Sequence, residues 1–391
     1  MYDDLKGYNE YGSISGPIYL KEESGPRSVA KIAAIFDCDG VLIDAKQSYN
    51  LAIGETVSLF MAECFGLDLD SSYISDEIIY RFRASGGFNN DWDLTYFVIL
   101  WLLSNLLNKD AKVRDKIDSK DFNRSILSLR SLMNSGGKEG LLKDIISSMS
   151  RDLLVLADRA DSTGIKSLKN GISLGPEMLE NVSLLLGYPG DFQNSLMVRM
   201  FEEIFYGKTL FQETYGANTI FYSGNGLINN ERIIVDESTL QKISEGVGKQ
   251  SLGIASGRSL FSTRFTLKNL LNYFNPKGMV FIEDEVRKED PQTLNSIVMD
   301  VGKPSPFSLL KACNEMGESE RILYVGDSME DLLMVKNANV HDKRIEFVGV
   351  YSSGISSSEK ISTMAGNGAS ALIPSVNELP IVIARIGDQR N

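Results

Sequence analysis

The sequence predicts an α/β protein in which a parallel sheet is interrupted by a large helical insertion. From residue 251 onward, short apolar runs alternate with helical patterns, which is typical of a parallel sheet covered by helices. An earlier apolar run, Ile32–Phe36, has the same character but is followed by about two hundred residues of mostly helical spacing. The first strand of the sheet is therefore expected to be separated from the others by a helical domain.

The chain begins with a polar segment, followed by the first expected strand. Residues 1–30 are rich in Gly, Ser and Tyr, and we expect an arm that lies on the body or is partly disordered. The strand at Ile32–Phe36 ends in Asp37 and Asp39, and Gly40 follows. Unpaired charge near an apolar core is costly, so two carboxylates here suggest a cation, and Mg²⁺ fits them. Taken alone, the segment could also be a simple Asp-Gly turn.

The insertion is expected to consist of helices, because apolar residues recur there at i, i+3 and i+4. This spacing is found in Asn50–Phe65, Leu94–Leu107, Leu141–Ala157 and Leu196–Phe211. We therefore divide the chain into an N-terminal arm (1–30), an α/β core (31–44 and 237–391) and a helical domain (45–236).

The second half of the chain supplies the remaining strands of the core. We expect them at Leu252–Ala255, Met279–Glu283, Ile322–Val325 and Phe347–Val350. Two of these strands end in polar residues, as the first strand does, which places polar groups at one edge of the sheet.

Three segments of this half contain residues suited to phosphate and metal chemistry. Ser256 and Gly257 offer a hydroxyl and backbone N–H groups at a strand end, which suits a phosphate oxygen. Lys303 stands in a Pro-containing loop before a helical stretch. Asp327 and Asp331 are one helical turn apart and would lie on the same side. Each segment alone has a structural alternative, because Ser-Gly is a common loop dipeptide and a single Lys is usually a solvated surface charge.

Taken in order, these segments resemble the haloacid dehalogenase (HAD) superfamily. The family pattern is D-x-D-G-x-x-x-D, then a strand-end Ser or Thr, then Lys, then G-D-x-x-x-D. The chain matches it at Asp37, Asp39, Gly40, Asp44, Ser256, Lys303, Gly326, Asp327 and Asp331. The resemblance implies a Rossmann-like HAD core of subfamily I with an inserted α-helical C1 cap, similar to phosphoglycolate phosphatase or β-phosphoglucomutase. The interval from Asp37 to Ser256 is 219 residues, which implies an enlarged cap.

The resemblance also implies roles in phosphoryl transfer. Asp37 would be the nucleophile that forms an aspartyl-phosphate, and Asp39 the general acid and base. Mg²⁺ would be held by the carboxylates of Asp37 and Asp327 and by the backbone carbonyl of Asp39. Asp331 would orient a metal-bound water or the lysine from outside the metal's own ligands. A structural role is expected for Asp44.

The same resemblance assigns phosphate binding to Ser256, the Gly257 N–H and Lys303. The lysine would also reduce the repulsion between the attacking carboxylate and the phosphate dianion.

One segment of the helical domain offers candidates for substrate recognition. Glycines, amides and an aromatic residue precede a buried helix there and could form a substrate-reading loop. An equally good alternative is an ordinary loop that ends in a helix N-cap. The candidate residues are Arg81, Arg83, Asn89, Asn90 and Trp92.

Composition excludes several classes of function. A net charge of −12 and a pI of about 4.8 argue against general nucleic-acid binding. The three cysteines are scattered, which predicts neither a disulfide framework nor a zinc site. The N-terminal residues contain no apolar run of signal-peptide type, so we expect a cytoplasmic protein with no membrane partner. A buried cap helix has the pattern of an interface helix, so a homo-oligomer formed through the cap stays open.

The residues favour a Mg²⁺-dependent phosphatase, an HAD-like phosphoric monoester hydrolase acting on a small phosphorylated metabolite. A phosphomutase of the β-phosphoglucomutase type uses the same motifs and is the first alternative. The alternative from another class is a non-catalytic HAD-fold protein that binds a phosphorylated metabolite.

Overall fold

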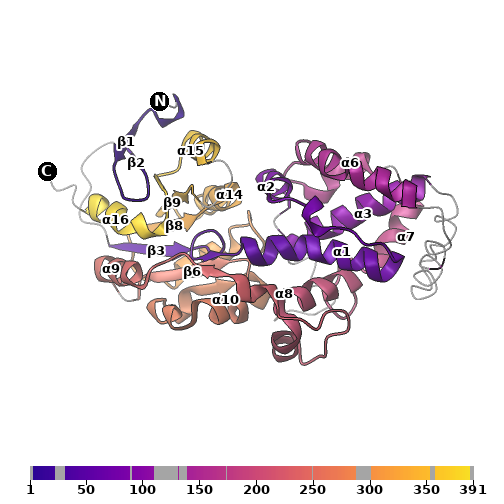
Figure 1. Cartoon of the computed structure of the whole chain (residues 1–391). Helices are drawn as coiled ribbons and strands as arrows, with labels where there is room; N and C mark the ends of the chain where they lie inside the picture. The colour runs from indigo at the N-terminus through magenta and orange to yellow at the C-terminus, as the bar shows by residue number, and fades with distance from the viewer. Residues whose placement is uncertain are drawn as a thin grey trace. The chain divides into compact units, whose positions relative to one another are not determined.

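The computed structural model describes residues 3–22, 31–88, 90–109, 131, 139–172, 174–248, 250–287, 301–352 and 357–387. The chain divides into two compact units: Met1–Ala45 together with Glu231–Asn391, and Lys46–Asn230. Both units are drawn in Figure 1, and each is described here by itself.

The first unit is built on an eight-stranded sheet with the order β1-β2-β10-β9-β8-β3-β6-β7. The five neighbouring pairs from β10 to β7 are parallel, as the alternation of strands and helices predicted. The strands are β1 (Tyr8–Tyr11), β2 (Ile18–Lys21), β3 (Ile32–Phe36), β6 (Leu252–Ser256), β7 (Met279–Phe281), β8 (Arg321–Gly326), β9 (Ile345–Val350) and β10 (Ala371–Ile373). β3, β6 and β8 are buried along their whole length, which explains their continuous apolar sequences.

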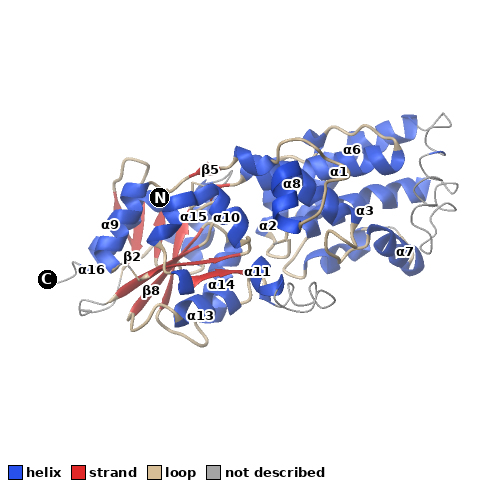
Figure 2. Ribbon diagram, turned by 90° about the horizontal axis from the view of Figure 1, so that it is seen from below, coloured by secondary structure: helices blue, strands red, loops and turns tan. Residues whose placement is uncertain are grey.

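Helices flank this sheet, as Figure 2 shows. They are α9 (Glu237–Val247), α10 (Leu260–Leu267), α11 (Ile282–Arg287), α13 (Phe307–Asn314), α14 (Met329–Ala338), α15 (Ser357–Gly366) and α16 (Leu379–Gly387). One boundary differs from the sequence-based expectation. The strand expected at Met279–Glu283 ends at Phe281, and α11 begins at the next residue, because the acidic residues that follow suit the first turn of a helix.

Two segments of the expected N-terminal arm, β1 and β2, are strands of the sheet. β1 and β2 form an antiparallel pair, and β2 pairs antiparallel with β10. The Tyr8 hydroxyl donates a 2.5 Å hydrogen bond to the Ala369 carbonyl and fastens this edge to the body. The sequence did not predict these strands because neither has a long buried apolar run. Every residue of β1 is at least partly exposed, and β2 has only three buried residues.

A second, two-stranded ladder stands where the chain leaves and re-enters this unit. β4 (Ile43–Asp44) pairs antiparallel with β5 (Arg232–Ile233), with Asp44 opposite Arg232. Asp44 is thus a strand residue, in agreement with the structural role expected for it. The helical insertion lies between these two short strands in the sequence.

The second unit is helical (Figure 1). The four helices expected from apolar spacing are all present. The helices of this unit are α1 (Leu51–Phe65), α2 (Asp76–Ala84), α3 (Asp91–Lys109), α6 (Glu139–Ala157), α7 (Pro176–Leu186) and α8 (Leu196–Tyr215). α3 is buried from Leu94 to Ser104 and packs on α1, α6 and α8. None of the described helices combines the length and the apolar character needed to cross a bilayer.

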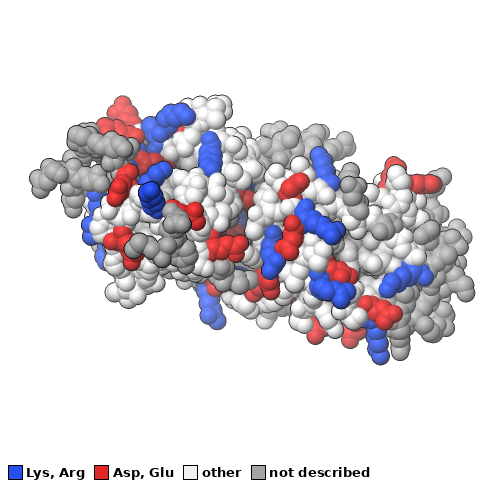
Figure 3. Space-filling model, turned by 90° about the horizontal axis from the view of Figure 1, so that it is seen from above, with Lys and Arg blue, Asp and Glu red and all other residues white. Residues whose placement is uncertain are grey.

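Charged side chains are mixed on the surface. Figure 3 shows acidic and basic residues interspersed over the visible face, with no continuous basic patch among the described residues there. This agrees with the negative net charge of the chain.

Candidate active site

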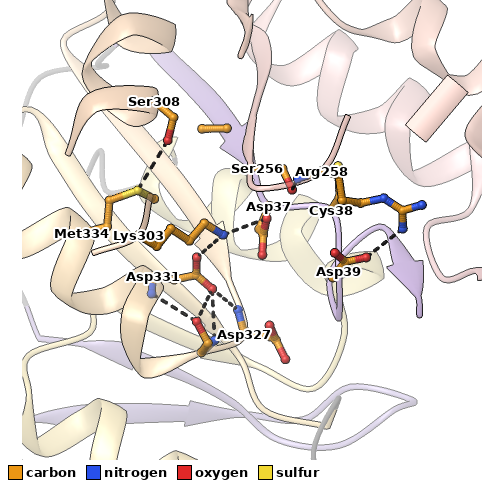
Figure 4. Close-up of polar contacts among 12 residues, drawn as sticks. Asp37, Cys38, Asp39, Ser256, Arg258, Lys303, Ser308, Asp327, Asp331 and Met334 are labelled. Carbon is orange, nitrogen blue, oxygen red and sulfur yellow. Dashed lines mark hydrogen bonds and ion pairs between the residues drawn. The ribbon is translucent and has the colours of Figure 1, made fainter. Parts of the chain in front are cut away.

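The polar residues that follow the central strands meet at one edge of the sheet. Asp37 follows β3 and Asp327 follows β8, and these strands are parallel neighbours in which Phe36 lies opposite Val325. Ser256 ends β6, the parallel neighbour on the other side of β3. Because parallel strands end at the same edge, the three segments converge. Lys303, from the loop before α13, joins them (Figure 4).

Lys303 links two buried carboxylates at this edge. Its Nζ lies 2.8 Å from Oδ1 of Asp37 and 2.7 Å from Oδ1 of Asp331. Burial alone would lower the pKa of Lys303, but the two acids raise it well above its ordinary value. The amine therefore stays charged and offsets part of the negative charge around Asp37.

Among the acids at this sheet edge, Asp37 is the one whose negative charge is least compensated by its surroundings. Burial raises its pKa to about 7, although Lys303 acts in the opposite direction, and the nearby Asp331 and Asp39 raise it further. A cation brought to this carboxylate would favour its ionised form.

Asp331 is held firmly by its surroundings. Its Oδ2 accepts hydrogen bonds from the Asp327 N–H (3.1 Å), the Ser328 N–H (3.1 Å) and the Ser328 hydroxyl (2.8 Å). The Asp331 N–H donates in return to the Ser328 hydroxyl oxygen (3.1 Å), which completes a capping box at the start of α14. The Tyr324 hydroxyl donates to Oδ1 at 3.0 Å. Burial alone would raise the pKa of Asp331, but Lys303 and the Ser328 donors hold it below its usual value. Both oxygens are engaged, so this residue fits a supporting role.

Two glycines allow this close approach. A Cβ on Gly40, which has a φ of 74°, would lie 2.4 Å from Oδ2 of Asp327. A Cβ on Gly326 would lie 2.5 Å from the Cβ of Asp331. The glycines of the two Asp-containing motifs are therefore required for the carboxylates to gather.

The donor set fits a hard divalent cation such as Mg²⁺. Asp37, Asp327 and Asp331 each place a carboxylate oxygen within 4.8 Å of the others. Carboxylates with water are the ligands that Mg²⁺ takes in proteins. Since Asp331 is fully engaged, Asp37 and Asp327 are the residues that would hold the ion.

Lys360, on α15, contacts one of these two acids, Asp327, and was missed by the sequence reasoning. Its Nζ donates to the Asp327 backbone carbonyl at 2.6 Å and lies 3.0 Å from Oδ2 of Asp327. No strand-end motif marks this lysine, so no local signal in the sequence could have found it.

Asp39 points in a different direction from these acids. Its Oδ1 accepts a hydrogen bond from Nη1 of Arg258 at 2.8 Å, and Figure 4 shows the side chain turned toward that arginine. Arg258 also lies 2.9 Å from Oε2 of Glu231. The sequence reasoning missed both partners, although Arg258 belongs to the same segment as Ser256 and Gly257 and could have been considered with them.

Ser256 and Gly257 lie where a phosphate group was expected. Ser256 is buried at the end of β6, and the Gly257 backbone borders open space. Cys38 lies between the two acids in the sequence and is also buried. Burial raises the pKa of this thiol to about 12, so Cys38 is a packing residue and not a nucleophile.

The candidates in the helical unit have structural partners. Arg81 pairs with Glu77 and Asp158 on the surface. Oδ1 of Asn90 accepts the Trp92 N–H at 2.9 Å at the start of α3, as an N-cap would. The capping alternative thus describes this residue. Asn89 lies outside the described residues.

The other two candidates are also engaged within this unit. Arg83 contacts Asn50 and Asp91, and the Trp92 indole N–H donates to Glu202 at 3.1 Å. These contacts do not test the expected role in substrate recognition, which stays a prediction.

A comparison with protein families agrees with this geometry. A model described as haloacid dehalogenase-like hydrolase matches residues 200–339. This segment of the chain is therefore similar to a haloacid dehalogenase-like hydrolase. The match includes Ser256, Lys303, Asp327 and Asp331, whereas Asp37 and Asp39 precede it. Asp37 and Asp39 come directly after β3, and the roles expected for them stay predictions.

The chain was also compared with solved structures, and one of them shares its overall fold. A target of the Northeast Structural Genomics Consortium, with no organism given, is 20% identical with a TM-score of 0.61, and the likeness covers 92% of this chain and 100% of that one. Phosphatase Tt82 from Thermococcus thioreducens is 19% identical with a TM-score of 0.45, covering 86% and 99%. A Lactobacillus plantarum protein provisionally named phosphoglycolate phosphatase is 10% identical with a TM-score of 0.38, covering 92% and 99%. The last two TM-scores are too low to establish a shared fold. No curated protein matches the chain.

Proposed function

We propose that the protein is a Mg²⁺-dependent phosphatase that hydrolyses a small phosphorylated metabolite through an aspartyl-phosphate on Asp37. The observation that carries the proposal is the position of Lys303, whose ammonium group contacts both Asp37 and Asp331 at the edge of the sheet. Asp327 adds a third carboxylate to the same place. With a divalent cation bound to these acids, such a site would suit an anionic substrate, because the ion and Lys303 would offset the negative charge of the carboxylates and of the phosphate.

The residues divide the reaction between them. Asp37 attacks phosphorus, while Lys303 reduces the repulsion between this carboxylate and the phosphate oxygens. Ser256 and the Gly257 N–H bind the phosphate. Asp39 protonates the leaving alkoxide and then removes a proton from the water that hydrolyses the acyl-phosphate. Mg²⁺, held by Asp37, Asp327 and the Asp39 backbone carbonyl, would neutralise the charge of the transferring group.

The helical unit fits the position of a C1 cap, because it is inserted after β3 and before β6. We therefore propose that Lys46–Asn230 is a cap that selects the substrate, with Arg83 and Trp92 among its candidate contacts. A phosphomutase with the same four motifs remains the alternative, and it would retain the phosphoryl group instead of releasing phosphate.

The test is phosphate release from a panel of phosphorylated metabolites and from p-nitrophenyl phosphate, with Mg²⁺ or with excess chelator. We expect release that needs Mg²⁺ and returns when the ion is restored. Full activity in chelator would contradict the metal assignment. Turnover only with a bisphosphate activator, without net phosphate release, would favour the mutase.

A further inference from the structure

Arg258 is a buried cation placed between two acids. Its side chain is 1% exposed, and the two ends of its guanidinium contact Asp39 (2.8 Å) and Glu231 (2.9 Å). A guanidinium presents a planar fork of donors, so contacts on both branches fix its orientation. The position of this arginine is therefore set by the fold.

Glu231 supplies the fixed end of this arrangement. Its side chain is fully buried, and its Oε2 accepts hydrogen bonds from both Arg258 and the Thr266 hydroxyl of α10 (2.5 Å). A buried carboxylate requires such partners, because an uncompensated charge in the interior is costly. Glu231 and Arg258 thus hold one another in place under the surface of the sheet edge.

Asp39 differs from both partners in its exposure. Its side chain is 39% exposed, although it contacts an arginine that is almost completely buried. An exposed aspartate has several rotamers available, and a contact from a fixed donor selects one of them. The hydrogen bond from Arg258 to Oδ1 therefore holds the carboxylate of Asp39 in one orientation.

We propose that Arg258 is a positioning residue for Asp39, and that the buried Glu231 fixes the guanidinium in the orientation that this task needs. The inference rests on the proposed function, in which Asp39 exchanges protons with the leaving group and with water. Misplacing a catalytic group by about 1 Å can cost about 100-fold in rate, so a fixed rotamer is valuable.

The test is a double-mutant cycle between Arg258→Met and Asp39→Asn, followed by steady-state turnover of p-nitrophenyl phosphate and of an alkyl phosphate. If Arg258 acts through Asp39, R258M alone lowers kcat by about 10- to 100-fold with KM changed less than about 3-fold. In the D39N background the same substitution has almost no further effect, because the group that it positions is already gone. Where leaving-group departure limits the rate, R258M should lower kcat more for the alkyl ester than for p-nitrophenyl phosphate. The alkoxide needs a proton in order to leave more than p-nitrophenolate does.

Variants with related charge changes separate positioning from folding. R258M leaves Glu231 buried without its arginine, so Arg258→Met with Glu231→Gln removes both charges together. Arg258→Lys keeps one charged donor and should restore part of kcat. Arg321→Met is the matched control, because Arg321 forms a buried ion pair with Glu346 at the opposite, amino-terminal end of β8. It should leave kcat unchanged in the folded protein.

The outcomes distinguish this inference from the proposed function. Losses that multiply in the cycle, or a KM effect with normal kcat, would overturn the positioning role while wild-type turnover and its dependence on Asp37 persist. If R258M fails to fold, the same kcat comparison is made with the R258M/E231Q double variant and with R258K. Wild-type protein that releases phosphate from no ester would overturn the proposed function itself, and this inference with it.

Discussion

Buried carboxylates occur in both units of this molecule, but their surroundings differ. In the α/β unit, Asp37 and Asp331 face the ammonium group of Lys303. In the helical unit, the buried Glu203 accepts hydrogen bonds from the backbone N–H groups of Ile220 (2.9 Å), Phe221 (2.7 Å) and Tyr222 (3.0 Å).

The difference separates a reactive site from a structural one. Glu203 also pairs with Arg199 at 2.8 Å, so backbone amides and a cation together satisfy its charge and fasten the 220–222 segment to α8. Asp37 instead shares one amine with another acid, and its pKa is raised to about 7. Incomplete compensation at a sheet edge marks a group that awaits a ligand, whereas full compensation marks a group that holds the fold.

The largest effect is expected at Asp37. Asp37→Asn removes the nucleophile but keeps the shape of the side chain, so turnover of p-nitrophenyl phosphate should fall by at least about 10⁴-fold. Circular dichroism should be unchanged. The control is Asp342→Asn, which removes an acid of the same unit that pairs with Arg344 outside the site. Activity of D37N near that of D342N would refute the nucleophile assignment.

Lys303→Met tests how strongly the α/β unit depends on a single cation. Without the amine, two buried carboxylates lose their shared partner, and the free energy of unfolding should fall by about 3–5 kcal/mol. Denaturant unfolding at neutral pH, with chelator present so that no metal replaces the charge, measures this. Lys277→Met, on a lysine outside this cluster, serves as the control. A loss below about 1 kcal/mol would show that the acids are compensated by other groups.

Much of the fold and half of the site could be predicted because their signals are local. Asp37 and Asp327 each come directly after a continuous apolar strand, whereas Lys303 was assigned through the family resemblance. The helices α1, α3, α6 and α8 carry apolar periodicity over several turns. Signals of this kind lie within a few consecutive residues, so they can be read without knowing which segments meet.

The remaining site residues depend on contacts between distant segments. Glu231 reaches Arg258 across 27 positions, and Lys360 reaches Asp327 across 33, and no motif surrounds Glu231 or Lys360. When only the sequence is read, a charged residue that is buried in the fold looks the same as one on the surface. The N-terminal strands were missed for a related reason, since Tyr8–Tyr11 is polar and gains its order only by pairing with β2.

Glu203→Gln tests the structural side of the comparison. The amide offers one acceptor oxygen, so at least one backbone N–H of the 220–222 segment loses its charged partner. We expect a loss of about 2 kcal/mol in the free energy of unfolding of the helical unit. Hydrogen exchange should become faster at these three amides. Glu177→Gln, an exposed acid on α7, is the control, and equal exchange in both variants would contradict the anchoring role.

The smallest effect is expected at Asp93, a partly exposed acid of the helical unit. The Tyr188 hydroxyl donates to its Oδ1 at 2.5 Å, and burial raises the pKa of Asp93 to about 6 although this hydrogen bond lowers it. The unfolded chain has an ordinary value near 3.9, so the folded state binds more protons between these values. Stability must therefore fall as the pH rises from about 4 to about 6, and stay lower above that range.

Asp93→Asn removes this titration and keeps an oxygen that can accept the Tyr188 hydroxyl. Since Asp93 retains partial exposure, we expect a gain of only about 1–2 kcal/mol over wild type at pH 7, declining toward zero near pH 4. Urea unfolding of both proteins from pH 4 to 7 measures the difference, with Asp144→Asn on the exposed face of α6 as control. A difference that does not change with pH would mean that Asp93 ionises as easily in the folded unit as in the unfolded chain. In that case the surroundings of Asp93 would compensate its negative charge as well as the surroundings of Glu203 do. Asp37 would then differ from Asp93 only in how deeply it is buried.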